Sequence, residues 1–240
     1  MKLFEWDAGG PYRVAFSTRV GGVSEGSFES LNLGILTADE PANVVENRTR
    51  LCREVGADPK DATMAWQVHG RRVTEADSRG IVTPGTVYER CDGLWTDKTG
   101  RALVLLTADC FPVALARTSG PPRLAVLHVG WRGLLDGIAQ EGMDAMQGNG
   151  IAAAVGPGIG PCCYEVGDEV AEPFRARFGD DVVTGRKLDL GLATERALLE
   201  AGCASVERNG MCTSCEAQLF FSHRRDGGRT GRQGVIAYIS

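Results

Sequence analysis

The chain has 240 residues and a formal net charge of −5, an acidic balance that argues against a nucleic-acid-binding protein. Hydrophobic residues make up 43% and charged residues 24%, which is ordinary for a globular protein with a sizeable core. The longest apolar stretch, residues 102–116, contains Asp109 and is too short to span a membrane. The N-terminus lacks the apolar run and cleavage site of a secretory signal. We therefore expect a cytoplasmic protein that binds neither nucleic acid nor a membrane.

The predicted elements alternate between strands and helices in chain order. Residues 12–17 alternate apolar and polar side chains and predict a strand. Asp39 is expected to cap a helix that has Pro41 in its first turn and runs to about Val55, closed by Gly56. Further strands are predicted at 63–68, 102–107, 112–116, 124–128, 151–155 and 233–239, and helices at 131–146, 166–178 and 190–201. No repeat or linker divides these elements, so we expect a single α/β domain over residues 1–240.

Three of the predicted strands end beside a side chain that can bind a metal ion: His69, Cys110 and His128. The chain contains only 3 His, and two of them stand at these equivalent positions. Two imidazoles and a thiolate suit zinc or copper. Three protein ligands leave a fourth position open, as in catalytic zinc sites. The set therefore predicts a catalytic metal ion, although no local spacing ties the three ligands together.

Two other interpretations use neighbouring residues. Cys110 and His128 could instead form a thiol nucleophile and its general base. His223 with Cys212 and Cys215 could form a second metal site. Only one CxxC pair is present in that segment, so we interpret it as two thiols in a loop. Most of the 8 Cys are expected to be small buried residues.

Two segments have the composition of anion sites. Residues 223–232 carry four Arg and several Gly, which suit a phosphate or carboxylate group, although a solvated surface loop is the commoner structure for such a run. Residues 156–160 are rich in glycine and precede a predicted helix, whose N-terminus can bind an anion. They lack the spacing of a Walker loop and of GxGxxG, so the prediction is weak.

Six motifs in a fixed order resemble the laccase-domain family, whose members are called polyphenol oxidases or purine nucleoside phosphorylases. The motifs read FESLNLG, WQVHG, TADC, HVGWRG, GPGIGPCCYEVG and FFSHRRDGGRTGRQ. The similarity runs from about Phe16 to the C-terminus. It departs from the pattern at His223, where many relatives carry Tyr, and the Cys215 thiol is not part of the motif. Roles for these two side chains are therefore in doubt.

The resemblance implies an α/β/β/α sandwich of mixed sheets like that of some cysteine hydrolases. It implies zinc on His69, Cys110 and His128, and phosphorolysis of adenosine, inosine and methylthioadenosine, with adenosine deamination as a second activity. Copper-dependent phenol oxidation has also been attributed to the family. With 3 His, the chain cannot supply the imidazoles of a multicopper cluster, so a lone copper ion is the most it would bind.

The predicted roles follow from the matching positions. Cys110 and His128 are expected to act in catalysis. The residues expected to contact the nucleoside or phosphate are Asn32, Arg48, Gln67, Arg132 and Arg225, with Arg232 as a further phosphate candidate. Trp66, Phe111 or Trp131 could stack on a purine, and core packing is the alternative for each.

Two alternatives come from other functional classes. The first is a cysteine amidohydrolase that edits cell-wall precursors, and the second is a non-enzymatic protein that senses nucleotides. The expected partners are purine nucleosides and phosphate, and the sequence does not indicate an oligomeric state.

Overall fold

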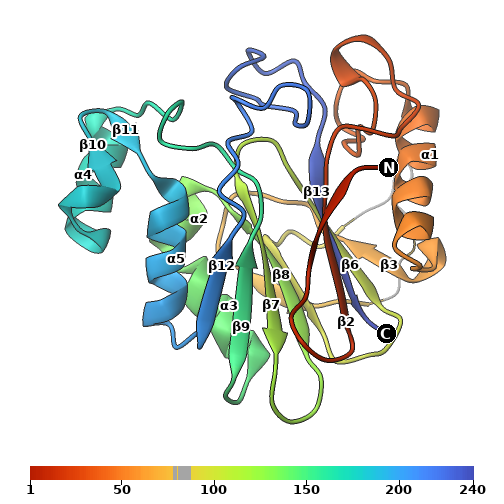
Figure 1. Cartoon of the computed structure of the whole chain (residues 1–240), viewed down its shortest axis with the longest axis horizontal. Helices are drawn as coiled ribbons and strands as arrows, with labels where there is room; N and C mark the ends of the chain where they lie inside the picture. The colour runs from red at the N-terminus through yellow and green to blue at the C-terminus, as the bar shows by residue number, and fades with distance from the viewer. Residues whose placement is uncertain (78–79, 81–87) are drawn as a thin grey trace.

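The strands form two large mixed sheets in the computed structural model, which describes residues 1–77, 80 and 88–240 (Figure 1). The first sheet has the order β1 (Leu3–Trp6), β2 (Tyr12–Ser17), β13 (Gln233–Ile239), β6 (Ala102–Thr107), β3 (Ala62–Met64). The second has the order β12 (Ser205–Arg208), β9 (Ile151–Val155), β7 (Phe111–Arg117), β8 (Leu124–Val129), β5 (Gly93–Thr96), β4 (Val73–Glu75). A short ribbon pairs β10 (Val183–Thr184) with β11 (Lys187–Leu188).

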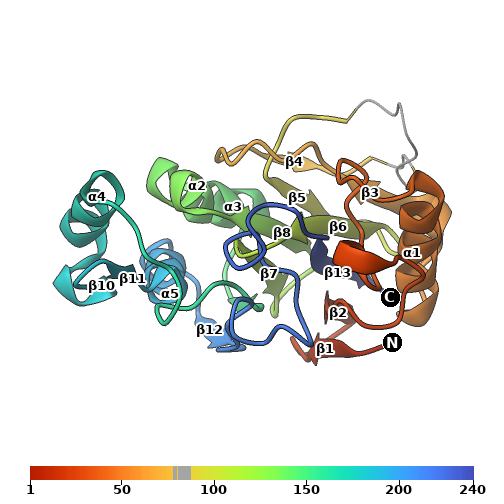
Figure 2. The same ribbon diagram turned by 90° about the horizontal axis from the view of Figure 1, so that it is seen from above.

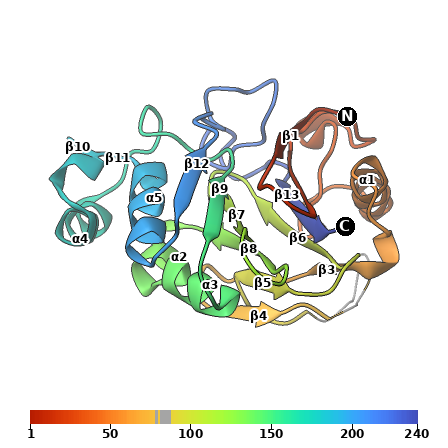
Figure 3. The ribbon, with the colours of Figure 1, turned by 60° about the horizontal axis from the view of Figure 1, so that its bottom comes forward.

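Helices cover the outer faces of both sheets (Figure 3). They are α1 (Pro41–Glu54), α2 (Trp131–Asp136), α3 (Ile138–Met146), α4 (Asp168–Phe178) and α5 (Leu190–Glu200), with short 3-10 turns at Gly26–Phe28, Pro59–Asp61 and Asp180–Val182. Leu51 of α1 packs on the first sheet with Val104 and Ile236. The other helices pack on the second sheet, where Leu127 is fully buried. The mixed α/β fold with helices on both sides is therefore confirmed.

The inner faces of the two sheets pack directly against each other. Phe16 and Leu103 of the first sheet share one buried cluster with Leu124 and Val126 of the second. Strands β8 and β13 are buried along their whole length, which explains their nearly continuous apolar sequences. Burial of this kind dominates the stability of such a layered fold.

The strands at 12–17, 102–107, 151–155 and 233–239 begin and end where the sequence predicts them. The predicted helix over 131–146 is wrong in one respect, because Gly137, with φ 99°, divides it into α2 and α3. The predicted strand over 63–68 ends already at Met64. The residue before α1 is Glu40 rather than Asp39, and its side chain makes no capping hydrogen bond. Strands β1, β4, β5 and β12 were not predicted, because they are short and three of them, β1, β4 and β12, lie at sheet edges.

None of the helices in the described part of the chain combines the length and apolar character that crossing a membrane requires.

Replacing Leu127 by alanine tests the core of the second sheet. Leu127 is fully buried and fills space next to Gly93 and Gly142, neither of which has a side chain. We expect Leu127→Ala to lower the free energy of unfolding by about 2–5 kcal/mol, measured by urea denaturation. Leu199→Ala is the matched control, because Leu199 is 47% exposed and its truncation should change stability by only about 0.5 kcal/mol. Equal effects in the two variants would contradict this packing.

Candidate metal centre

The side chains of His69, Cys110 and His128 converge at one point. Their ligand atoms all lie within 4.8 Å of one another. The two imidazole rings meet edge to face, with ring centroids 4.8 Å apart. His128 is buried, Cys110 is half-buried and His69 is exposed, so the group faces outward from the end of the sheets. The three residues that the sequence singles out are thus close enough to share one ion.

The antiparallel pairing of β7 and β8 places two of these ligands. His128 lies within β8 opposite Pro112, and Phe111 pairs with Val129. Cys110, the residue before Phe111, therefore comes opposite Gly130. A Cβ atom on Gly130 would lie 3.1 Å from both Cys110 Sγ and His69 Cδ2. Only glycine at this position leaves the ligands undisturbed.

His69 is held by the buried carboxylate of Asp92 rather than by a strand. Its backbone is left-handed, with φ 60°, a conformation that is uncommon for residues other than glycine. The backbone amides of Val68, His69 and Gly70 donate hydrogen bonds of 3.1, 2.9 and 2.8 Å to the Asp92 carboxylate. These three bonds stabilise the turn that brings the imidazole to the centre.

The same carboxylate orients His128. Asp92 Oδ1 lies 2.8 Å from His128 Nδ1, and the His128 amide donates to the Asp92 carbonyl at 2.7 Å. A partner on Nδ1 leaves Nε2 to face the centre, as is usual for metal-binding histidines. Burial raises the pKa of Asp92, but the hydrogen bond and charge of His128, together with the Gly70 and Val68 amides, outweigh it and lower that pKa. Asp92 therefore stays ionised.

The side chains of Cys110 and His128 shift each other's pKa. Burial raises the pKa of the Cys110 thiol, but the neighbouring imidazoles of His128 and His69 outweigh burial and lower it. Burial lowers the pKa of His128, whereas Cys110 and Asp92 raise it by a larger amount. The proton accordingly favours the imidazole, and Cys110 is a thiolate that can act as a metal ligand or a nucleophile.

Asp109 connects the centre to the C-terminal segment that runs over the ends of the sheets between β12 and β13 (Figure 2). Its backbone is also left-handed, with φ 89°, immediately before Cys110. Its carboxylate accepts hydrogen bonds of 2.7 Å from Thr213 Oγ1 and from the Arg224 amide. Its carbonyl accepts from the Ile159 amide at 2.8 Å. Three chain segments are thereby fixed around the thiolate.

The Cys110 thiolate interacts electrostatically with an arginine and a tyrosine side chain. Burial lowers the pKa of Arg232, and the negative charges of Asp109 and Cys110 act in the opposite direction. Burial raises the pKa of Tyr164 to about 12, and the charge of Cys110 adds to this while those of Arg224 and Arg132 oppose it. Tyr164 is therefore a neutral phenol near the centre.

Two of the predicted substrate residues make internal contacts that fix the loop after the first 3-10 turn. Arg48 is 4% exposed, and its Nε donates to the Leu33 carbonyl at 2.8 Å. Asn32 is fully buried, and its amide nitrogen donates to Thr37 and Asp39. Its oxygen accepts from the Arg232 amide at 2.9 Å. Asn32 therefore influences the site by fixing the backbone position of Arg232.

The remaining predicted residues differ in their surroundings. Gln67 exchanges two hydrogen bonds with the backbone of Leu106 and so extends the β3–β6 pairing towards His69. The Arg225 guanidinium donates to Asp226 and to the carbonyls of Thr213, Ser214 and Phe220. Arg132 is exposed, and its guanidinium lies 4.1 Å from the Trp131 ring centroid. Arg132 is consequently more accessible to an anion than Arg225.

The three aromatic candidates for stacking on a purine also differ. Phe111 is 8% exposed and belongs to the core of the second sheet. Trp131 is partly buried against the same core. Trp66 is 39% exposed, three residues before His69. Of the three, Trp66 therefore exposes the largest fraction of its surface to a ligand.

A cavity of about 370 Å³ lies beside the metal centre rather than over it. It is lined by Phe111, by part of the glycine-rich segment 156–160, and by Asp189 and Arg208 among others. None of the three converging ligands lines it. Arg208 is paired with Glu195 at 2.8 Å. The anion site predicted at the glycine-rich segment stays a prediction.

Sequence reasoning missed Asp92, Asp109 and Tyr164 as parts of the centre. Asp92 precedes a short strand that was not predicted, and its contacts with residues 68–70 span more than twenty positions along the chain. Asp109 and Tyr164 do lie inside the TADC and GPCCYEVG motifs. Those motifs were the only signal that could have pointed to them.

The comparisons with known proteins cover almost the whole chain, but the family model and the relatives are named after different activities. Residues 13–240 match the family model described as multi-copper polyphenol oxidoreductase laccase. The purine nucleoside phosphorylase YlmD of Geobacillus stearothermophilus is 38% identical, over 94% of this chain and 89% of that protein. The purine nucleoside phosphorylase YfiH of Escherichia coli is 34% identical, over 93% and 92%. A crystal structure of the hypothetical protein YfiH of Bacillus licheniformis superposes with a TM-score of 0.88 at 33% identity, covering 95% of this chain and 93% of that one.

Gly130→Ala is expected to remove one equivalent of bound metal per chain, because the new methyl group would contact Cys110 Sγ and His69. Metal content is measured by mass spectrometry of purified protein after incubation with Zn²⁺. Gly167→Ala is the matched control, because a methyl group there meets only the flexible carboxylate end of Glu169. Full metal content in the Gly130 variant would contradict the close approach of these side chains.

Asp92→Asn is expected to lower the affinity for Zn²⁺ at this centre by about 10–100-fold, because the charge that orients His128 and the turn at His69 is lost. The affinity is measured by competition with a chromogenic chelator. The ion bound at this centre is identified as the one that His69→Ala fails to bind. The exposed Asp136→Asn provides the control for loss of a carboxylate. An unchanged affinity in Asp92→Asn would rule out this orienting role.

Proposed function

The chain belongs to the multi-copper polyphenol oxidoreductase laccase family, and from this premise we propose that it is a zinc-dependent purine nucleoside phosphorylase. Its substrates would be adenosine, inosine and methylthioadenosine together with phosphate, with adenosine deamination as a side activity. The names of the relatives in G. stearothermophilus and E. coli support the reaction class. The observation that carries the proposal is the convergence of His69, Cys110 and His128 within 4.8 Å.

The three residues fit a catalytic zinc ion. Two imidazoles and one thiolate are a donor set that zinc accepts, and three protein ligands leave a position for substrate. Gly130 leaves room beside the ligands, and Asp92 supplies the carboxylate partner usual for a metal-binding histidine. When bound, zinc supplies Lewis-acid polarisation of a substrate atom. Zinc is preferred over copper because 3 His cannot ligate a multicopper cluster, whatever the family name implies.

Phosphate binding is assigned to the arginines nearest the centre. The charge of Arg232 interacts with those of Cys110 and Asp109, and Arg132 is exposed beside Trp131. A guanidinium matches the geometry of phosphate oxygens and keeps its charge at neutral pH. Arg232 Nη1 donates to the carbonyls of Thr230 and Gly231, and we propose that its other N–H groups contact the anion. Arg48 and Arg225 also donate to backbone carbonyls, and we propose that they shape the site.

The residues around the centre can assist cleavage of the glycosidic bond. A phosphate oxygen forms a bond to C1′ of the ribose as the bond from C1′ to the purine nitrogen breaks, and the departing base takes up a proton from solvent water. Tyr164 is a neutral phenol at any physiological pH and can donate a hydrogen bond to the base or to phosphate. Trp66, which is 39% exposed, is the candidate for stacking on the purine.

We also propose that residues 1–240 act as one domain. The site needs both sheets, since His69 follows β3 and His128 lies in β8. A cytoplasmic location fits the eight cysteines, all of which are described and unpaired, because a reducing compartment keeps thiols in that state.

One observation favours a second candidate, a cysteine amidohydrolase. The Cys110 thiolate, the His128 imidazole and the Asp92 carboxylate form the nucleophile, base and orienting group of thiol hydrolases. His69 is not a member of that arrangement. The two candidates therefore make different predictions for this one residue.

His69→Ala is expected to reduce kcat/KM for adenosine phosphorolysis by at least about 100-fold, since loss of a ligand should cost more than loss of a ligand's partner. Metal-quantified protein is incubated with adenosine, with and without phosphate, and the products are separated by chromatography. Adenine and ribose 1-phosphate that form only with phosphate show phosphorolysis, and inosine shows deamination. His223→Ala replaces an exposed histidine outside the centre and should retain its metal.

The competing outcomes are distinct. If His69→Ala and chelated wild-type protein still hydrolyse an amide substrate while Cys110→Ser does not, the thiol hydrolase replaces the phosphorylase. If metal-loaded wild-type protein converts neither adenosine, inosine nor methylthioadenosine in the presence of phosphate, the proposed activity is wrong.

A further inference from the structure

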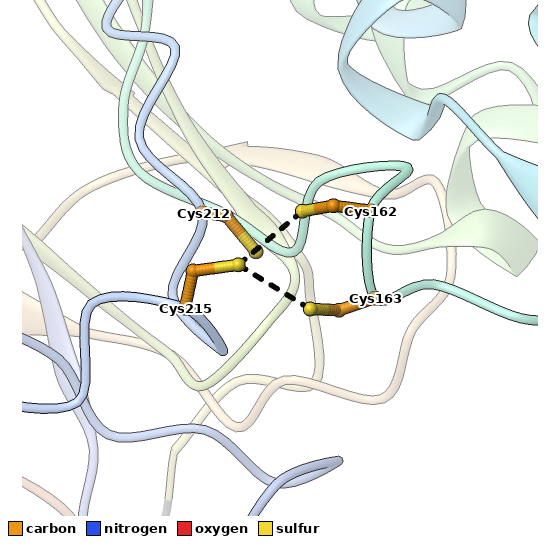
Figure 4. A group of neighbouring side chains, drawn as sticks. All are labelled: Cys162, Cys163, Cys212 and Cys215. Carbon is orange, nitrogen blue, oxygen red and sulfur yellow. Dashed lines mark hydrogen bonds between the residues drawn. The ribbon is translucent and has the colours of Figure 1, made fainter.

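Four cysteines outside the metal centre gather where two loops meet. Cys162 and Cys163 follow β9, and Cys212 and Cys215 follow β12. Their sulfur atoms all lie within 4.8 Å of one another, and Figure 4 shows the four side chains pointing towards a common centre. His223 does not belong to this group. The pair that the sequence suggests as two thiols in a loop therefore has two partners that the sequence did not link to it.

The sulfur positions suit a shared ion better than disulfide bonds. Cys215 Sγ lies 3.4 Å from both Cys162 Sγ and Cys163 Sγ. A tetrahedral zinc ion with Zn–S bonds of about 2.3 Å separates its sulfur ligands by about 3.8 Å. A disulfide requires about 2.05 Å between two sulfurs and leaves the other two thiols without a role. One sulfur placed equally far from two others is expected for a tetrahedron, not for a bonded pair.

The backbone around Cys212 is arranged to stabilise a thiolate. The Gly160 amide donates to Cys212 Sγ at 3.2 Å. Amide donors of this kind are the usual support for sulfur ligands of a metal. In addition, Lys187 Nζ donates to the Cys162 carbonyl at 3.2 Å, which places a positive charge beside the cluster.

The two loops are joined by their backbones even without an ion. Gly158 and Cys212 form a bridge, and the Thr213 amide donates to the Gly158 carbonyl at 2.9 Å. The cluster is therefore largely preformed in the folded chain. Cys162 and Cys215 are exposed, so an ion can enter from solvent.

We propose that Cys162, Cys163, Cys212 and Cys215 bind a structural zinc ion. Four protein sulfurs close the coordination sphere, which distinguishes this site from the three-ligand centre at His69. Four Zn–S bonds form on binding and the thiol protons pass to water, so no oxidant or reductant takes part. The ligand class is a thiophilic divalent cation.

The position of this site gives the ion a supporting role. Thr213 follows Cys212, and its hydroxyl holds the Asp109 carboxylate at 2.7 Å. Asp109 in turn precedes Cys110. An ion that clamps residues 212–215 to residues 162–163 therefore stabilises the segment that fixes Asp109, while it shares no ligand with the first centre.

Zinc stoichiometry of the full chain tests the proposal. Wild-type protein purified under reducing conditions with Zn²⁺ should hold two equivalents per chain by mass spectrometry. Cys215→Ser and Cys162→Ser should each hold one, and Ser214→Ala, a change of one hydroxyl in the same loop, should hold two. His69→Ala should lose the other equivalent, and His69→Ala with Cys215→Ser should hold none. Because Cys215 and Cys162 are exposed, these variants are expected to fold.

Cobalt provides a second measurement that does not depend on activity. Co²⁺ added to metal-free His69→Ala should give the charge-transfer and visible bands of a tetrahedral tetrathiolate, and Cys215→Ser in that background should abolish them. Equal zinc content in wild-type protein and Cys215→Ser would overturn the proposal. So would iron in place of zinc, or a mass two hydrogens lower that shows an oxidised pair. Failure of the phosphorylase assay leaves these readouts unaffected, so the two proposals can fail separately.

Discussion

The buried carboxylate of Asp92 is the constraint on which the rest of the centre depends. It accepts the amides of residues 68–70 and binds the imidazole of His128, so it joins a turn that follows the first sheet to a strand of the second. Burial raises the pKa of this carboxylate, but three backbone amides and the His128 imidazole outweigh burial, so the pKa lies below its ordinary value and Asp92 keeps its charge. The positions of His69 and His128 therefore follow from one side chain that makes no contact with substrate in the proposed reaction.

The sequence predicted the central strands because burial on both faces leaves a periodic or continuous apolar signal, as in residues 12–17, 102–107 and 233–239. It predicted the three ligands largely because histidine is scarce in this chain and two of the 3 His stand within the family motifs WQVHG and HVGWRG. It did not predict that His69 lies in a turn, since the left-handed backbone there is imposed by Asp92 from outside the segment. Likewise nothing local shows that Cys162 and Cys163 meet Cys212 and Cys215, because that meeting depends on how β9 and β12 pair.

The arginine-rich C-terminal segment shows how charge composition can mislead. Four Arg between residues 223 and 232 predict an anion site as a group, yet Arg225 is committed to Asp226 and to backbone carbonyls. Its role is to fold the segment so that the Arg224 amide reaches Asp109. Arg232 also donates to the carbonyls of Thr230 and Gly231, but only through Nη1, and it is distinguished by its electrostatic interaction with Cys110 and Asp109. A cation is available to a ligand only when the fold leaves its hydrogen-bonding capacity unspent, which composition alone does not reveal.

The two proposed metal sites of this small protein differ in their ligands and in their openness to solvent. The centre at Cys110 offers one thiolate and two imidazoles in an open arrangement, whereas the four-cysteine cluster offers only sulfur in a closed one. Asp109 and Thr213 connect them through hydrogen bonds alone, so an ion in one site can stiffen the other without competing for its ligands. Such a separation lets the closed site bind tightly and keeps the open site accessible. The loop that carries Cys212 contacts Asp109, the residue before Cys110, so an ion bound in that loop would stabilise the position of the Cys110 thiolate.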